Sequence, residues 1–255
     1  MSERNDVARQ LRVCALYPDL MNIYADRGNL LVLEQRCRWR GIDFELCGSG
    51  LGEGLDPDAH DIFYIGGGQD RDQLLCAQDL LDTKHAALHA ADARGAIVLG
   101  VCGGYQLLGH SYALGGEEIE GVGLLDVQTV REPGPRLIGN VAIEVSLPAA
   151  GGVDMWDGVL AGFENHGGRT RLGEDQAPLG RVLKGHGNDG RGGFEGAIAG
   201  SVIGTYMHGP LLPKNAWFAD WLIARALELR PGELEPLADS LERDAHSSAL
   251  RAAGM

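Results

Sequence analysis

The stretch from residue 96 to residue 109 constrains the fold of this chain more than any other segment. Residues 96–99 are apolar and partly β-branched, as expected of a strand that is covered on both faces. Gly100 and Gly104 flank Cys102, and a helix is expected to begin at Gly103. Such glycines permit the tight turn of a nucleophile elbow, here with Cys in place of Ser. A helix N-terminus beneath the sulfur favours the thiolate. The alternative is a small cysteine of the core.

A thiolate nucleophile needs a base, and His208 is the candidate. Residues 201–207 have the pattern of a strand, which ends at His208 just before Gly209 and Pro210. Open α/β sheets place their chemistry at the carboxyl ends of the strands, so His208 and Cys102 are expected to meet there. Thiol catalysis commonly joins a Cys and a His that are distant in the sequence. A His that only satisfies turn carbonyls is the alternative.

The first half of the chain alternates short apolar segments with helical patterns. This order predicts a parallel sheet with helices on both faces. After Gly115 the pattern becomes β-rich and punctuated by glycines. We expect strands at 11–17, 43–47, 61–65, 123–130, 137–147, 159–164, 181–184 and within 194–207, and helices at 29–40, 70–94 and 214–229. The expected organisation is a single domain over residues 1–230 and a charged tail over 231–255.

The composition excludes several classes of protein. A net charge of −14 argues against a nucleic-acid or anionic-membrane partner. Residues 1–10 are polar and lack the apolar core of a signal peptide, and no apolar run approaches the ~18 residues of a transmembrane helix. The odd number of cysteines, 5, without a C-x-x-C pair argues against a disulfide framework. These features predict a cytoplasmic protein in which Cys102 stays reduced.

Two segments resemble a known family. Residues 100–109 (GVCGGYQLLG) together with 204–210 (GTYMHGP) resemble the class I, triad-type glutamine amidotransferases, in their cobyric-acid-synthase-like branch. Residues 16–29 (LYPDLMNIYADRGN) and 39–42 (WRGI) are similar to the opening of the glutaminase subunits of lipid II isoglutaminyl synthases. The resemblance covers roughly residues 11–225.

The resemblance implies a fold and a reaction. The fold would be α/β and flavodoxin-like, a mostly parallel sheet flanked by helices, with β-rich additions in the second half. The chain would hydrolyse L-glutamine through a Cys102 thioester and pass ammonia to a Mur-ligase-like partner, which amidates the D-glutamate of the lipid II stem peptide. No cofactor is expected on this chain, and ATP and magnesium would bind the partner. The lipid-linked acceptor would be met at the inner membrane face through that partner.

A glycine turn after the third expected strand is the candidate for an oxyanion hole. Acyl transfer through a thiol passes through an oxyanion, which needs backbone N–H donors already in place. Gly103 supplies one donor, and Gly67 or Gly68 can supply another because glycine lets an N–H point inward. The matching turn has this role in the class I amidotransferases. A plain strand-to-helix turn is the alternative.

The amino-acid end of glutamine needs its own contacts. Its α-carboxylate suits a guanidinium, which binds both oxygens at once. The candidates between the elbow and His208 are Arg131, Arg136, Arg169, Arg171 and Arg181. Arg136 is favoured because it opens a strand after a Pro-Gly-Pro turn, in an Arg-Leu-Ile-Gly-Asn run that the isoglutaminyl synthases share. Gln106 resembles the glutamine-contacting residue of the family. Surface positions are the alternative for both side chains.

The chain departs from the family pattern at Pro210. Class I triads usually carry Glu at this position to orient the imidazole. Either another acid of this chain takes the role, with Glu164 the first candidate, or the partner supplies it. No metal site is expected, because neither His166 nor His186 has a second ligand nearby in the sequence and the cysteines lack zinc spacing.

Two other functions stay open at the level of sequence. A glutaminase of a cobyrinate or cobyrate amidation system normally carries a fused ATP-using domain, for which 255 residues leave no room. A non-catalytic binding or regulatory module would not need to keep both Cys102 and His208.

Overall fold

A six-stranded sheet forms the centre of the molecule in the computed structural model, which describes residues 9–23 and 26–255. The strand order is β13-β14-β4-β3-β1-β2, with all neighbours parallel except β13 and β14. The strands are β1 (Gln10–Leu16), β2 (Asp43–Ser49), β3 (Ile62–Ile65), β4 (Ile97–Val101), β13 (Ala197–Ala199) and β14 (Val202–Thr205). β3, β4 and β14 are buried throughout, because helices cover both faces of the sheet.

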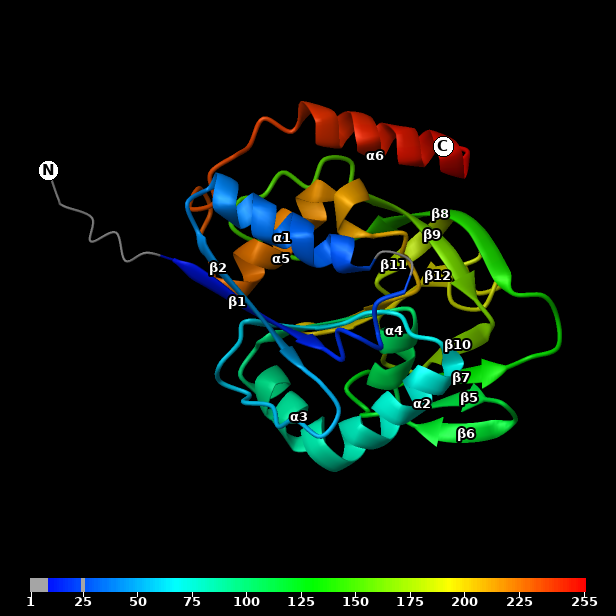
Figure 1. The fold of residues 1–255 in the computed structure, drawn as a ribbon. Helices are drawn as coiled ribbons and strands as arrows, with labels where there is room; N and C mark the ends of the chain where they lie inside the picture. Colours follow the sequence, from blue (N-terminus) through cyan, green and yellow to red (C-terminus); the bar gives the residue numbers. More distant parts are fainter. Residues whose placement is uncertain (1–8, 24–25) are drawn as a thin grey trace, which may run out of the picture.

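The helices form two layers around this sheet (Figure 1). One layer holds α1 (Arg27–Trp39) and α5 (Ala216–Ala226), and the other holds α2 (Asp70–Asp79), the π-helical turn η1 (Leu80–Lys84), α3 (His85–Ala93) and α4 (Gly103–Leu108). Each layer has its own apolar cluster against the sheet. The mostly parallel α/β fold that the sequence predicts is therefore confirmed.

Two further four-stranded sheets are formed between residues 111 and 195, in the region where the sequence predicts a β-rich pattern after Gly115. One has the order β10-β7-β5-β6 and the other β12-β11-β8-β9. The first contains β5 (Ser111–Leu114), β6 (Glu117–Glu120), β7 (Val127–Arg131) and β10 (Gly168–Leu172). The second contains β8 (Leu137–Val145), β9 (Val159–His166), β11 (Gly180–Lys184) and β12 (Phe194–Glu195). The residues after Pro231 include α6 (Ser240–Ala253), which packs on β8, β9 and the short η2 (Leu212–Lys214).

Some expectations about the elements are wrong. The sequence does not predict β5, β6 and β10, because they are only four or five residues long and because β6 and β10, rich in Glu and Arg, show little apolar alternation. An apolar face of the 70–94 helix would be expected to bury its leucines, but Leu74 and Leu75 are 44% and 47% exposed. The smaller Cys76 and Ala77 face the sheet in their place. Within residues 9–23 and 26–255, no helix is long and apolar enough to cross a membrane.

A buried group of four charges joins three of the helices. Arg36 of α1 is 1% exposed and contacts both Asp220 of α5 and Asp239, the residue before α6. Its Nη2 donates to Asp220 Oδ2 at 2.6 Å and to Asp239 Oδ2 at 2.9 Å. Arg40 adds a second guanidinium on Asp220, with Nη2 also 2.6 Å from Oδ2. Two cations and two anions thus neutralise each other where α1 and α5 meet the residue that precedes α6.

Removing one member of this group should destabilise the fold. Asp220→Asn leaves two buried guanidinium groups facing a single carboxylate, so we expect a loss of about 3–5 kcal/mol in the free energy of unfolding. Urea unfolding followed by circular dichroism measures this loss. Arg38→Ala is the matched control, because Arg38 forms an exposed pair with Glu34 and should cost less than about 0.5 kcal/mol. Equal unfolding midpoints for the two variants would contradict the prediction.

Candidate functional site

Cys102 lies in a strained turn between β4 and α4. Its φ is +55° and its ψ is −106°, a conformation that non-glycine residues rarely adopt. Its N–H donates to the Thr205 carbonyl at 2.8 Å, which ties the turn to the end of β14. A Cβ on Gly104 would lie 2.2 Å from the Ile65 carbonyl oxygen, so only glycine fits there. The turn is the nucleophile elbow that the sequence predicts. The contacts around it keep Cys102 in this strained backbone conformation.

The charge state of Cys102 differs from the expectation that the helix N-terminus favours the thiolate. Burial, followed by the nearby Asp26, raises the pKa of the Cys102 thiol to about 12. The Gly103 N–H and the positive charge of Arg136 act in the opposite direction but do not offset burial. The desolvation cost of a thiolate at this position exceeds what one short helix and one distant cation contribute. The thiol is therefore protonated at neutral pH.

The glycine turn after β3 lies directly beside the elbow. A Cβ placed on Gly103 would lie 3.2 Å from the Gly68 nitrogen, so the backbones of these two residues are adjacent. The N–H of Gly67 has a different partner, because it donates to Asp26 Oδ2 at 2.9 Å. Of the three expected donors, Gly68 and Gly103 come together at Cys102, whereas the Gly67 N–H faces Asp26.

His208 follows β14 and is fully buried. Its backbone pairs with Phe163 of β9 in both directions, at 2.9 and 3.1 Å, and the two rings meet edge to face at 5.9 Å. β14 and β4 are parallel neighbours with Thr205 opposite Val101, so His208 and Cys102 leave the sheet at the same edge. Burial, then Lys214 and Arg136, lower the pKa of His208 to about 4. The imidazole is thus neutral at pH 7.

Glu164, the first candidate for an acid beside His208, is engaged elsewhere. Its carboxylate accepts the N–H groups of His186 and Gly187 at 2.7 and 2.9 Å. Successive side chains of a strand point to opposite faces, and the preceding Phe163 is the residue that contacts His208. Glu164 therefore anchors the loop after β11.

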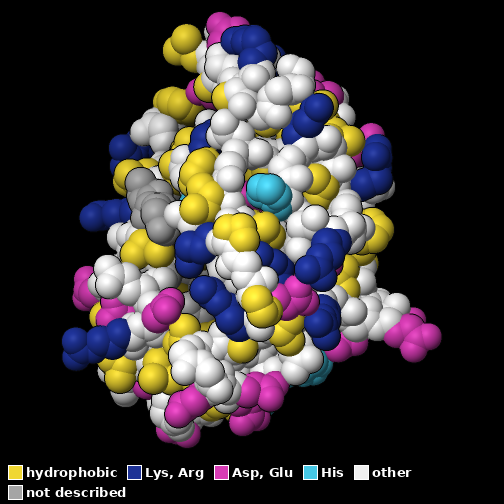
Figure 2. Space-filling model, turned by 90° about the vertical axis from the view of Figure 1, so that its right-hand side faces the viewer, with side chains coloured by type: hydrophobic (Ala, Val, Ile, Leu, Met, Phe, Trp, Pro, Cys, Tyr) yellow, Lys and Arg dark blue, Asp and Glu magenta, His cyan; other side chains and the backbone are white. Residues whose placement is uncertain are grey.

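Among the five candidate arginines, Arg136 is the one whose positive charge lowers the pKa of both Cys102 and His208. Its Nε and Nη2 donate to the side chain and the carbonyl of Asn165 at 2.8 and 2.7 Å. Arg169, in contrast, is buried and donates to the carbonyls of Gly167, Gly168 and Pro135. Arg171 and Arg181 pair with glutamates at the surface. Lys and Arg side chains gather on the face of the molecule seen in Figure 2, although the chain is acidic as a whole.

Gln106 belongs to a buried chain of polar side chains. Its amide nitrogen donates to the Tyr206 hydroxyl at 3.2 Å, and its oxygen accepts from Gln73 of α2 at 2.8 Å. The Tyr206 hydroxyl continues to Thr170 at 2.6 Å and Thr170 to Thr129 at 2.7 Å. The side chain of Gln106 is therefore oriented by two partners one turn after Cys102.

Sequence reasoning missed three buried polar residues around this site. Asp26 is fully buried against Gly67, and burial raises its pKa to about 6. Glu195 accepts the Tyr206 N–H at 2.6 Å and the Thr205 hydroxyl at 2.9 Å, so it holds the strand end that leads to His208. The sequence does not indicate that Gln73 is buried, because a polar residue in a helix is expected on the exposed face of that helix.

The matches with known proteins agree with this geometry. Residues 12–216 match the CobB/CobQ-like glutamine amidotransferase domain. The chain belongs to this family. It is 39% identical to the lipid II isoglutaminyl synthase (glutamine-hydrolyzing) subunit GatD of Staphylococcus aureus, over 89% of this chain and 88% of that protein. It is 37% identical to the subunit of the same name from Streptococcus pneumoniae, over 88% and 83%. The family that the sequence resembles is confirmed.

Other matches are either partial or distant. The cobyric acid synthase of Pelotomaculum thermopropionicum is 42% identical, but over only 49% of this chain and 25% of that protein. Among solved structures, PurLQS from Thermotoga maritima superposes with a TM-score of 0.59 at 20% identity, covering 86% of this chain and 95% of that one. A glutamine amidotransferase from the same organism has a TM-score of 0.52 at 17% identity, covering 96% and 92%. These two likenesses show the fold.

The raised pKa of Cys102 predicts how its reactivity depends on pH. Below a pKa of about 12, the thiolate fraction rises about tenfold per pH unit, whereas a free cysteine levels off near its ordinary pKa of about 8.5. Iodoacetamide modification of Cys102 in the isolated chain should therefore still accelerate between pH 8 and pH 10, by about two orders of magnitude. Peptide mass spectrometry measures the rate, with glutathione as the reference thiol. A rate already constant above pH 8 would contradict the prediction.

Proposed function

We propose that this chain is the glutamine-hydrolysing subunit of a lipid II isoglutaminyl synthase. The observation that carries the proposal is the match to two such subunits over nearly the whole of this chain and of each relative. The cobyric acid synthases match about half of this chain, so they support the hydrolysis of glutamine but not the same acceptor. The elbow thiol and the buried imidazole at the same sheet edge favour an enzyme over a non-catalytic module.

The reaction uses the groups at the sheet edge in sequence. The Cys102 sulfur forms a bond to the side-chain amide carbon of glutamine while its proton passes to His208. The oxyanion accepts hydrogen bonds from the N–H groups of Gly68 and Gly103. The carbon–nitrogen bond then breaks, His208 returns the proton to the leaving nitrogen, and ammonia departs. Water activated by His208 cleaves the thioester, and glutamate is released.

Arg136 and Gln106 hold the amino-acid end of the substrate in this proposal. The guanidinium of Arg136 binds the α-carboxylate of glutamine, and its position near both Cys102 and His208 supports this role. The side chain of Gln106, oriented by Gln73 and Tyr206, contacts the bound glutamine.

A partner completes the reaction. Ammonia passes to a Mur-ligase-like synthetase subunit, which binds ATP and magnesium and amidates the D-glutamate of the lipid II stem peptide. The complex works in the cytoplasm at the inner membrane face, where its lipid-linked acceptor lies.

The partner also supplies the third member of the triad. Pro210 stands where the family carries Glu, and Glu164 is engaged by the loop after β11. The low pKa of His208 makes it a weak base in this chain. A carboxylate brought beside it would raise that pKa, and the resulting imidazolium would lower the pKa of Cys102.

The proposed function is tested by comparing glutamine with ammonia as the nitrogen source for amidation. The complex of this chain with its synthetase should amidate lipid II with either source, and Cys102→Ala should abolish amidation from glutamine only. Ammonia bypasses the thioester, so amidation from ammonium salts should stay within about twofold. Mass spectrometry of the muropeptides measures both activities, and Cys76→Ala is the control with an unchanged elbow. Full activity of Cys102→Ala with glutamine would refute the proposal.

Arg136→Ala should weaken the binding of glutamine. Loss of a charge-assisted contact to the α-carboxylate costs about 2–4 kcal/mol, so kcat/KM should fall by two or more decades with an unchanged melting temperature. Arg171→Ala serves as the control, because Arg171 pairs with Glu132, and its kcat/KM should stay within about twofold of wild type. A wild-type kcat/KM for Arg136→Ala would show that another group binds the α-carboxylate of glutamine.

The isolated chain should be a poor glutaminase. An imidazole that lacks its orienting carboxylate loses up to about 10⁴ in rate in a related triad, so addition of the synthetase should raise glutamine turnover by several decades. Coupled glutamate release with and without the partner measures this. Equal rates would exclude a triad shared between the two subunits.

A further inference from the structure

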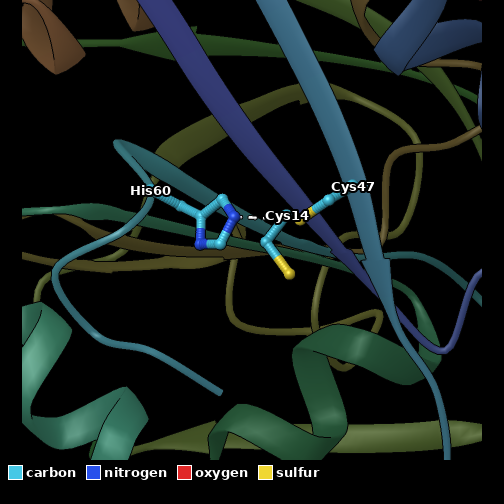
Figure 3. A group of neighbouring side chains, drawn as sticks. All are labelled: Cys14, Cys47 and His60. Atoms are coloured by element: carbon cyan, nitrogen blue, oxygen red, sulfur yellow. Dashed lines mark hydrogen bonds between the residues drawn. The ribbon is translucent and has the colours of Figure 1, made fainter. Parts of the chain in front are cut away.

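A group of three metal-ligating side chains lies outside the site described above. Cys14 of β1 and Cys47 of β2 stand opposite each other in the parallel register, and His60 lies near the end of the loop between β2 and β3. The two sulfurs and a ring nitrogen of His60 all lie within 4.8 Å of one another. Figure 3 shows the three side chains gathered at one point, with His60 Nε2 2.9 Å from the Cys47 sulfur.

From this arrangement we infer that Cys14, Cys47 and His60 bind a zinc ion. Zinc lies about 2.3 Å from thiolate sulfur and about 2.0 Å from imidazole nitrogen in tetrahedral sites. Tetrahedral angles then place the ligand atoms about 3.5–3.8 Å apart, within the spread of this group. Two thiolates and an imidazole suit zinc and disfavour magnesium or calcium, which take oxygen ligands. Cys47 and His60 are partly exposed, so water completes the coordination.

A divalent cation also resolves the electrostatics of the group. Cys14 is 1% exposed, so a thiolate at this position needs a counter-charge close to its sulfur. Two thiolates on adjacent strands would repel each other in this environment, whereas two thiolates and Zn²⁺ sum to zero charge. Binding therefore releases the thiol protons and leaves a neutral site.

The ligands are held in place by contacts that do not involve a metal. The Phe63 ring packs edge to face on the His60 ring at 5.6 Å. Arg94 donates to the carbonyl oxygens of both Pro57 and His60, which fixes the backbone of the loop. Among the described residues, Nδ1 of His60 has no hydrogen-bond partner, so the ring is oriented by Phe63 and by the contact of Nε2 with Cys47. The site is thus preorganised on two strands and an anchored loop.

The zinc site is separate from the elbow. Cys14 lies opposite Phe63 of β3, and Phe63 lies opposite Val98 of β4, four residues before Cys102. The two thiol sites are therefore separated by two strand spacings across the sheet and by four residues along the chain. The sequence shows no local metal motif, since 33 residues separate Cys14 from Cys47. Strand pairing brings the ligands together.

The metal content of the purified full-length chain tests this inference. The protein should be prepared without a polyhistidine tag and under reducing conditions, dialysed against trace zinc, and analysed by inductively coupled plasma mass spectrometry. We expect about one zinc per chain. Cys47→Ala is the first variant because Cys47 is partly exposed and its loss should leave the fold intact. His60→Gln is the second variant, and Cys76→Ala is the control, with a buried thiol on α2.

Cys47→Ala and His60→Gln should each weaken zinc binding by more than about 100-fold, since the loss of a supporting partner alone costs 10–100-fold. Replacement by Co²⁺ should give a thiolate-to-cobalt absorption band that Cys47→Ala weakens and Cys76→Ala keeps. Zinc below one ion in ten chains, equal zinc in wild type and Cys47→Ala, copper in place of zinc, or a Cys14–Cys47 disulfide in the reduced preparation would each overturn the inference. Circular dichroism confirms that the variants compared are folded.

Discussion

The position of the Cys102 sulfur depends on one close approach of two backbones. Gly104 lies so near the end of β3 that a Cβ there would collide with the Ile65 carbonyl oxygen, and its N–H donates to the Gly66 carbonyl at 3.1 Å. This contact holds the first turn of α4 against the glycine turn. The same contact keeps Cys102 at positive φ and places the Gly68 and Gly103 backbones side by side. The thiol and the candidate oxyanion donors are therefore fixed by a single packing constraint.

The charges around this thiol give the isolated chain a neutral site. Burial disfavours both the Cys102 thiolate and the His208 imidazolium, so neither member of an ion pair forms readily at neutral pH. The charges that act on His208 from Lys214 and Arg136 are positive and add to this effect. A negative charge from outside the chain, placed beside His208, would favour its imidazolium, and that cation would in turn favour the Cys102 thiolate. This electrostatic state agrees with the proposal that glutamine hydrolysis by this chain depends on the synthetase.

The sequence predicted the parts of the fold that follow from strong local patterns. The apolar run before Cys102, the flanking glycines and the strand before His208 are local signals, and the structure has β4, the elbow and β14 at these places. The short strands β5, β6 and β10 could not be predicted, because their pairing partners and not their composition make them strands. Contacts between residues that are far apart in the sequence could not be predicted for the same reason. Nothing near Asp26 in the sequence indicates that its carboxylate meets Gly67, 41 residues away.

The buried group of Arg36, Arg40, Asp220 and Asp239 has a consequence for how sequences of this family can diverge. Each aspartate compensates Arg36, and Asp220 also compensates Arg40, so the four positions share one charge balance. A neutral or reversed side chain at one position leaves an uncompensated ion at another. Over evolutionary time these positions should therefore change together, with an apolar replacement at Arg36 accompanied by replacements of its carboxylates. Homologues in which Asp239 and α6 are missing would keep only Asp220 against two guanidinium groups, so one of the two arginines should be replaced there as well.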